Sequence, residues 1–212
     1  LDLSDAGTQP MISGSGRHVI VFNGEIYNFQ AIRQYLQEQG VQFRTGTDTE
    51  VLLELYEREG ADCLEKLNGM FAFAIWDRQS KSLFLARDRL GKKPLYYYQR
   101  DGQFAFASEI KALHPLPFLD TTLRADALKD FFFYQYVPDP KSIYKSVHKL
   151  PPGHWLKLAD GGVTIKSYWD LSFRNQTATD EHQLEDDLRQ QLEDAVERRL
   201  VSDVPLGAFL SG

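Results

Sequence analysis

The stretch VIVFNGEIYN, residues 19–28, is a run of β-branched and aromatic residues that reaches an Asn-Gly pair and then leads into a helical pattern. Such a run is typical of a buried strand, and we predict one from Arg17 to Phe22. The pair Asn23-Gly24 is the commonest hairpin signal, so a simple turn is one interpretation. A strand that ends in a tight turn also presents backbone N–H groups and a short amide side chain, which can hold a negatively charged oxygen during acyl transfer. The local sequence alone favours the simple turn, because the dipeptide is so common.

Outward from this stretch, hydrophobic periodicity predicts helices and paired strands in turn. Asn28 is expected to cap a helix that ends near residue 39, and a short strand is expected from Val41 to Arg44. Thr47 and Glu50 have the spacing of a capping box, which predicts a second helix. The remaining segments are helices at 61–67, 108–114 and 125–134, and hairpins at 71–88, 94–108 and 154–168. This order predicts an α+β domain, a layered α/β/β/α sandwich of antiparallel sheets.

Composition changes after Trp169. Residues 172–180 are polar and turn-prone, residues 181–200 form an amphipathic helical pattern with apolar residues every four positions, and a strand is expected at 204–210. We therefore predict two domains, residues 1–170 and the beginning of a second, α/β domain at 171–212. Because the sequence starts without methionine and stops inside a predicted buried strand, we expect it to be a fragment of a longer protein.

Charge and composition exclude several classes of partner. The 212 residues carry a net charge of −6, which argues against nucleic acid and against an anionic membrane surface, because both prefer a basic face. The single cysteine, Cys63, excludes an internal disulfide and fits a reducing compartment. No signal peptide or apolar run long enough to cross a bilayer is visible. A cytoplasmic location is the expectation.

Seven strings of the sequence resemble, in order and spacing, the glutamine-hydrolysing asparagine synthetase family. They are FNGEIYN (22–28), TDTE (47–50), LNGMFAFAIWD (67–77), RDRLGKKPLYY (87–97), FASEIKAL (106–113), KLPPGH (149–154) and DVPLGAFLSG (203–212). The resemblance implies a class II (N-terminal nucleophile) glutamine amidotransferase domain, without its N-terminal segment, followed by the start of a pyrophosphatase-type ATP-binding domain.

The resemblance also implies a reaction for the parent protein. Glutamine would be hydrolysed to glutamate and ammonia, and the ammonia would pass through an internal tunnel to amidate an adenylylated aspartate, giving asparagine, AMP and pyrophosphate. ATP with Mg²⁺ would serve the synthetase domain, the glutaminase domain would bind no cofactor, and no metal site is expected in this chain. The resemblance leaves a homodimer open.

Residue roles follow from the same resemblance. Asn23 and the backbone N–H of Gly24 would form the oxyanion hole, and Asp48 with Glu25 would hold the α-ammonium group of glutamine. The alternative for Asp48 is to complement a helix N-terminus; the substrate role is favoured, and both roles can hold together. Leu1 would line the substrate pocket. The first contacts to ATP, which are incomplete, would be Leu210, Ser211 and Gly212.

The nucleophile that the family uses is an N-terminal cysteine upstream of Leu1, so this chain alone is expected to be inactive. We interpret Cys63 as a buried structural thiol, because no histidine lies near it in the sequence. Arg87-Asp88-Arg89 reads as a charged turn, and Tyr96–Tyr98 and Phe131–Phe133 as core or interface residues. Two alternatives stay open. One is an amidotransferase that acts on another carboxylate or on a sugar or nucleotide acceptor, and the other is a non-catalytic glutamine-binding or structural module.

Overall fold

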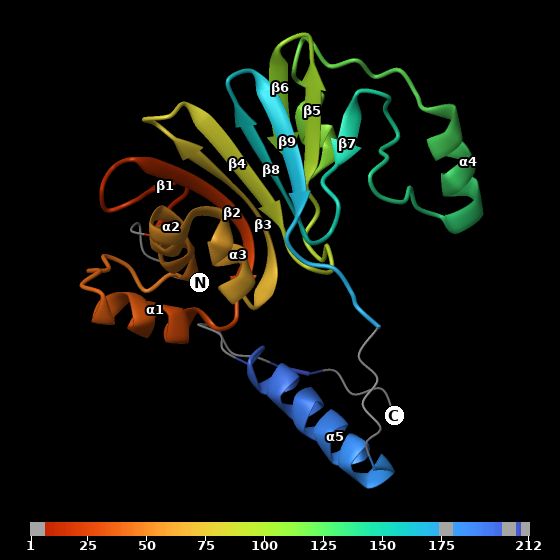
Figure 1. Ribbon diagram of the computed structural model, residues 1–212. Helices are drawn as coiled ribbons and strands as arrows, with labels where there is room; N and C mark the ends of the chain where they lie inside the picture. The colour runs from red at the N-terminus through yellow and green to blue at the C-terminus, as the bar shows by residue number, and fades with distance from the viewer. Residues whose placement is uncertain (1–6, 174–179, 201–206, 209–212) are drawn as a thin grey trace.

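A computed structural model describes residues 7–173, 180–200 and 207–208 (Figure 1). The strands are β1 (Met11–Ile12), β2 (His18–Ile26), β3 (Gly69–Asp77), β4 (Ser82–Arg87), β5 (Tyr96–Arg100), β6 (Gln103–Ala107), β7 (Val147–Lys149), β8 (His154–Ala159) and β9 (Gly162–Ser167). The α-helices are α1 (Phe29–Glu38), α2 (Asp48–Glu59), α3 (Cys63–Lys66), α4 (Ala125–Tyr134) and α5 (Glu181–Glu197), with 3-10 turns at Gly60–Asp62 and Ile110–Leu113.

Two antiparallel sheets face each other. The larger has six strands in the order β1-β2-β3-β4-β8-β9, and the smaller has three in the order β6-β5-β7. Figure 1 shows α1, α2 and α3 on the outer face of the larger sheet, and α4 beyond β7 on the side of the smaller one. This arrangement confirms the predicted layered α+β fold of antiparallel sheets.

The hydrophobic core has two main parts, one on each face of the larger sheet. Between the sheet and the helices, Ile20, Leu36, Leu55 and Phe73 are almost completely buried in one cluster. Between the sheets, the cluster includes Leu85 and Leu156 of the larger sheet together with Tyr97 of β5. Because β3 is covered on both faces, its central residues are buried without alternation, whereas β2 alternates.

Several predicted elements are confirmed. The three hairpins pair as β3–β4, β5–β6 and β8–β9, and the helices at 125–134 and 181–197 are present. Thr47 caps α2, because its side chain accepts a hydrogen bond from the Glu50 backbone N–H. The side chain of Glu50 does not complete the capping box. It is buried and accepts hydrogen bonds from the backbone N–H groups of Arg44 and Thr45 (3.0 and 2.7 Å).

Two local predictions are wrong, and a third is confirmed only in part. β2 does not end at Phe22 but continues through Asn23-Gly24 to Ile26, because β3 pairs with it over that whole length. Residues 41–44 form no strand. Asn28 lies at the N-cap position of α1 as predicted, but its side chain makes no capping bond, since its amide group bonds the Asn68 N–H and the Lys66 carbonyl (both 2.9 Å).

The region after Trp169 is described only in part. Helix α5 carries no buried residue, and the predicted strand at 204–210 lies mostly outside the described residues. No helix in the described part of the chain is long and apolar enough to cross a membrane.

Candidate active site

At Gly24, the β3 backbone lies where a side chain would otherwise be. A Cβ atom at this position would lie 2.2 Å from the Met70 carbonyl oxygen and 2.7 Å from the Phe71 Cα, both of which belong to the β3 backbone. No side chain larger than hydrogen fits without moving a strand. The Asn-Gly pair therefore lies inside a strand, packed closely against the neighbouring strand, and does not form a turn.

The Gly24 N–H lies on the outer edge of β2, between two backbone N–H groups that side chains accept. The Phe22 N–H donates to Oε1 of Gln9 (2.6 Å), whose Nε2 donates to the Phe22 carbonyl (3.1 Å). Two residues beyond Gly24, the Ile26 N–H donates to Oδ2 of Asp48 (3.0 Å). Backbone groups two residues apart on a strand point to the same edge, so the Gly24 N–H points away from β3 between these two contacts.

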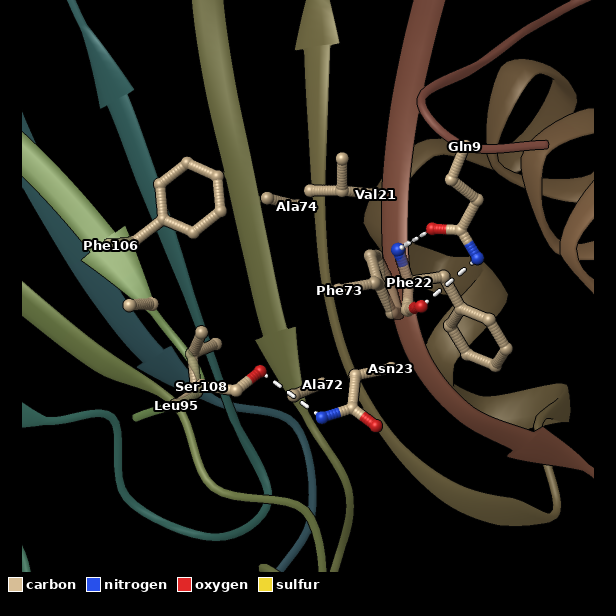
Figure 2. A pocket seen from close by; sticks show the side chains of 11 residues that line it. Gln9, Val21, Phe22, Asn23, Ala72, Phe73, Ala74, Leu95, Phe106 and Ser108 are labelled. Atoms are coloured by element: carbon tan, nitrogen blue, oxygen red, sulfur yellow. Dashed lines mark hydrogen bonds between the residues drawn. The ribbon is translucent and has the colours of Figure 1, made fainter. Parts of the chain in front are cut away.

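The side chain of Asn23 points from β2 into the space between the two sheets (Figure 2). Its Nδ2 donates to Oγ of Ser108 (3.1 Å), the residue that follows β6 of the smaller sheet. A cavity of about 230 Å³ lies beside this contact. Asn23, Ala72 and Ala74 of the larger sheet line it together with Phe106 and Ser108. The Asn23 amide therefore lies at this cavity, and the residue that follows it, Gly24, presents its N–H on the outer edge of β2.

Asp48 is the first residue of α2 and lies against the end of β2. Burial raises the pKa of its carboxyl group, and the negative charge of Glu25 adds to that effect, although hydrogen bonds from the N–H groups of Ile26 and Thr49 oppose it. Asp48 and Glu25 both lie near the end of β2, and carboxylates are acceptor groups suited to hold a cation. The alternative role at a helix N-terminus is also compatible with this position.

The predicted site residues fall into two groups. Asn23, Gly24, Glu25 and Asp48 come together around the last four residues of β2. Only Asn23 among them lines the 230 Å³ cavity. Leu1 and the predicted ATP contacts Leu210, Ser211 and Gly212 lie outside the described residues.

Sequence reasoning missed two residues of this site. Gln9 supports the edge of β2 through its side-chain amide, and nothing in the sequence around it indicates that role. Ser108 lies within FASEIKAL, one of the strings that carry the family resemblance, but the string indicates no role for the serine itself. Both residues are distant in sequence from Asn23, and only the fold brings them to it.

Cys63 is confirmed as a structural thiol. It is fully buried within the core between the helices and the larger sheet, and burial raises the pKa of the thiol well above its usual range. A thiol that stays protonated is a poor nucleophile. In the described ranges, no group of three or more His, Cys, Asp or Glu side chains could hold a metal ion.

Solved structures share the arrangement of two facing antiparallel sheets with helices on the outer face of the larger one. An allosteric regulatory enzyme of purine biosynthesis superposes with a TM-score of 0.57 at 23% identity, over 77% of this chain and 32% of that one. The glutamine phosphoribosylpyrophosphate amidotransferase of Bacillus subtilis superposes with a TM-score of 0.54 at 23% identity, over 76% and 32%. The chain shares its fold with both of these solved structures.

Sequence comparison assigns the chain more narrowly. The profile of the glutamine amidotransferase domain matches residues 1–169, and the chain belongs to this family. The asparagine synthase profile matches residues 187–212. Asparagine synthetase [glutamine-hydrolyzing] 1 of Bacillus subtilis is 38% identical over 213 residues, which span 100% of this chain and 33% of that protein. Asparagine synthetase B [glutamine-hydrolyzing] of Escherichia coli is 37% identical, over 98% and 32%. The chain spans about a third of the length of these relatives.

Proposed function

We propose that this chain is the glutaminase part, and the beginning of the synthetase part, of a glutamine-dependent asparagine synthetase. The parent protein would hydrolyse glutamine and use the ammonia to amidate aspartate activated by ATP, in the cytoplasm. Identity to curated asparagine synthetases along the whole chain supports this assignment, as does the match of its last residues to the asparagine synthase profile. The synthetase reaction, with ATP and Mg²⁺, would take place in the second domain, of which this chain would hold only the beginning.

The observation that carries the proposal is the set of groups gathered at the end of β2. A thiol that attacks the carboxamide carbon of glutamine converts the carbonyl into a tetrahedral oxyanion, which two aimed donors would stabilise. Asn23 supplies a side-chain N–H, and Gly24 supplies a backbone N–H on the edge of β2 that faces away from β3. Collapse of the intermediate releases ammonia and leaves a thioester, which water hydrolyses to glutamate and the free thiol.

The substrate amino group would be held by Asp48 and Glu25. Both are carboxylates near the end of β2, and the raised pKa of Asp48 reflects burial and the neighbouring charge. An α-ammonium group between them would restore charge balance. The nucleophilic cysteine would come from residues upstream of Leu1, because Cys63 is fully buried and burial raises the pKa of its thiol.

Glutamine binding to this chain, measured by calorimetry, tests the proposal. Asp48→Asn keeps an oxygen that can accept the Ile26 N–H and removes only the charge, so it should weaken binding by roughly tenfold or more without unfolding the chain. Asp186→Asn, an exposed position on α5, is the matched control and should bind as the unaltered chain does. Equal affinity of all three would contradict the substrate role of Asp48.

Activity is measured on the same samples and on the full-length protein. We expect no glutamine hydrolysis by the chain of 212 residues and hydrolysis by the full-length protein, which should also form asparagine when aspartate and ATP are supplied. Hydrolysis by the 212-residue chain would show that the nucleophile lies within this chain and not upstream of Leu1. Amidation of a different acceptor in place of aspartate would assign the protein to another amidotransferase class.

A further inference from the structure

Ser108 contacts Asn23 across the space between the two sheets (Figure 2). The hydrogen bond from Nδ2 of Asn23 to Oγ of Ser108 measures 3.1 Å and joins residues 85 positions apart. Asn23 belongs to β2 of the larger sheet, whereas Ser108 directly follows β6, an edge strand of the smaller sheet. The orientation of the Asn23 amide therefore depends on how the second sheet lies against the first.

The two proposed oxyanion donors are held in different ways. The Gly24 N–H is part of a strand that β3 packs against and that Asp48 and Gln9 hold along its outer edge. The Asn23 amide is an exposed side chain, and rotation about its terminal bond has a broad energy well. An amide nitrogen carries two hydrogens. If the hydroxyl oxygen of Ser108 accepts one of them, the plane of the amide is fixed and so is the direction of the other.

We propose that Ser108 is a positioning residue for glutamine hydrolysis, whose hydroxyl orients the Asn23 amide so that its second N–H is directed at the oxyanion. This inference rests on the proposed function, in which Asn23 and Gly24 are the oxyanion donors. Oxyanion donors lower the barrier because they are aimed before the reaction, so loss of orientation raises the barrier even though the donor is still present. The effect should appear in the chemical step and not in glutamine binding.

The matched pair Ser108→Thr and Ser108→Val, made in the full-length protein, tests the role of the hydroxyl. Threonine keeps the hydroxyl group, and valine has nearly the same shape without it. We expect Ser108→Val to lower kcat on the order of tenfold with KM within about twofold, which is less than the hundredfold to thousandfold loss that follows removal of a donor. Ser108→Thr should stay within roughly threefold of the natural protein. Ser167→Ala, which removes a remote hydroxyl that donates to the Trp169 carbonyl, should change neither constant.

A tetrahedral probe separates positioning from general damage to the fold. The γ-aldehyde analogue of glutamine forms a tetrahedral thiohemiacetal with a thiol, and its inhibition constant should rise in Ser108→Val by the same factor by which kcat/KM falls. Glutamine affinity, measured on the nucleophile-free 212-residue chain with the same substitution, should stay unchanged. If Ser108→Val fails to fold, Ser108→Ala replaces it in both measurements.

The double variant Asn23→Ala/Ser108→Val decides whether the serine acts through the asparagine. If it does, the valine substitution should add almost nothing to the loss caused by Asn23→Ala. Three outcomes would overturn the inference and leave the proposed function in place. The valine substitution could cause its full loss of rate again in the double variant, Ser108→Thr and Ser108→Val could have equal rates, or Ser108→Val could change KM alone. Absence of glutamine hydrolysis by the unaltered full-length protein would overturn the proposed function, and this inference with it.

Discussion

Gly24 shows how a single residue decides the geometry of the candidate site. The backbone of β3 occupies the place of its missing side chain, with the Met70 carbonyl oxygen 2.2 Å from where a Cβ would lie. This close approach fixes the N–H of Gly24 on the outer edge of β2. The glycine therefore has a packing role and a proposed catalytic role that depend on the same contact.

Replacing Gly24 with alanine should disturb both roles. The methyl group would push β2 from β3, which we expect to lower the free energy of unfolding by about 1–3 kcal/mol. Gly46→Ala is the matched control because nothing lies within 4 Å of a Cβ there, and its change should be within about 0.5 kcal/mol. Urea unfolding of both variants provides the measurement. Equal stability of the two would mean that the strands can separate at Gly24 without strain.

The charge on Asp48 leads to a prediction about pH. Glutamine keeps its α-ammonium group throughout the acidic range, so binding requires the carboxylate form of Asp48. Because burial and the charge of Glu25 raise the pKa of this carboxyl group above its usual 3.8, it becomes protonated at a higher pH than an ordinary aspartate. Glutamine affinity should therefore fall as the pH is lowered toward that raised value.

Calorimetric titrations at several pH values between about 7 and 4 check this expectation. The Asp48→Asn variant, which has no charge to lose at this position, should bind weakly with a much flatter dependence on pH. A profile in the natural chain that parallels that of the variant would assign the pH dependence to another group.

At the scale of whole elements, the sequence predicted the hairpins and most helices because their periodicity is local. The segment FAFAIWD with SLFLAR, for example, shows its strand character without knowledge of its neighbours, and it forms β3 and β4. The end of β2 was not predictable in this way. Asn-Gly usually marks a turn, and only pairing with β3, more than 40 residues later in the chain, keeps these residues extended.

The same distinction applies to the candidate site. The roles proposed for Asn23, Gly24 and Asp48 came from short strings of sequence, and the structure places these residues around one strand end. Gln9 and Ser108 could not be found from periodicity, since each reaches the site through a side chain whose partner is distant in sequence. The burial of Cys63, in contrast, follows from its place in a local apolar pattern.

The turn after β4 links the two sheets. Asp88 is buried, and its carboxylate accepts the backbone N–H groups of Phe71, Leu90, Lys92 and Lys93 at 3.0–3.2 Å. The Phe71 N–H points away from β2, so this carboxylate holds the start of β3 to the turn after β4 and also shapes the chain that leads into β5 of the smaller sheet. Neighbouring Arg87 donates to the carbonyls of Gly91, Lys93 and Leu150.

Asp88→Asn should be strongly destabilising. The amide replaces an acceptor oxygen by an NH₂ group that faces backbone donors, so we expect a loss of about 2–4 kcal/mol in the free energy of unfolding. Asp101→Asn, in an exposed turn, should have almost no effect. Thermal or urea unfolding distinguishes the two variants. A small change at Asp88 would indicate that the turn keeps its shape without the carboxylate.

At the scale of the whole molecule, apolar surface is concentrated in two helices outside the main core. Phe132 and Phe133 of α4 are 82% and 78% exposed, and α5 presents Leu184, Leu188, Leu192 and Val196 to solvent. The three hydrophobic clusters, in contrast, contain only residues between Met11 and Tyr168. Stability should therefore reside in residues before 170, which is what a domain boundary at that position requires.

Shortening the chain tests that boundary. A chain of residues 1–170 should unfold in urea with the same midpoint as the chain of 212 residues, and its free energy of unfolding should differ by less than about 1 kcal/mol, because α5 contributes no buried residue. A chain that ends at residue 150 is the opposing control. It lacks β8, which pairs with β4, and Leu156, which is buried between the sheets, so it should not fold cooperatively. A clearly lower midpoint for residues 1–170 would show that α5 belongs to the first folding unit and that the boundary lies beyond it.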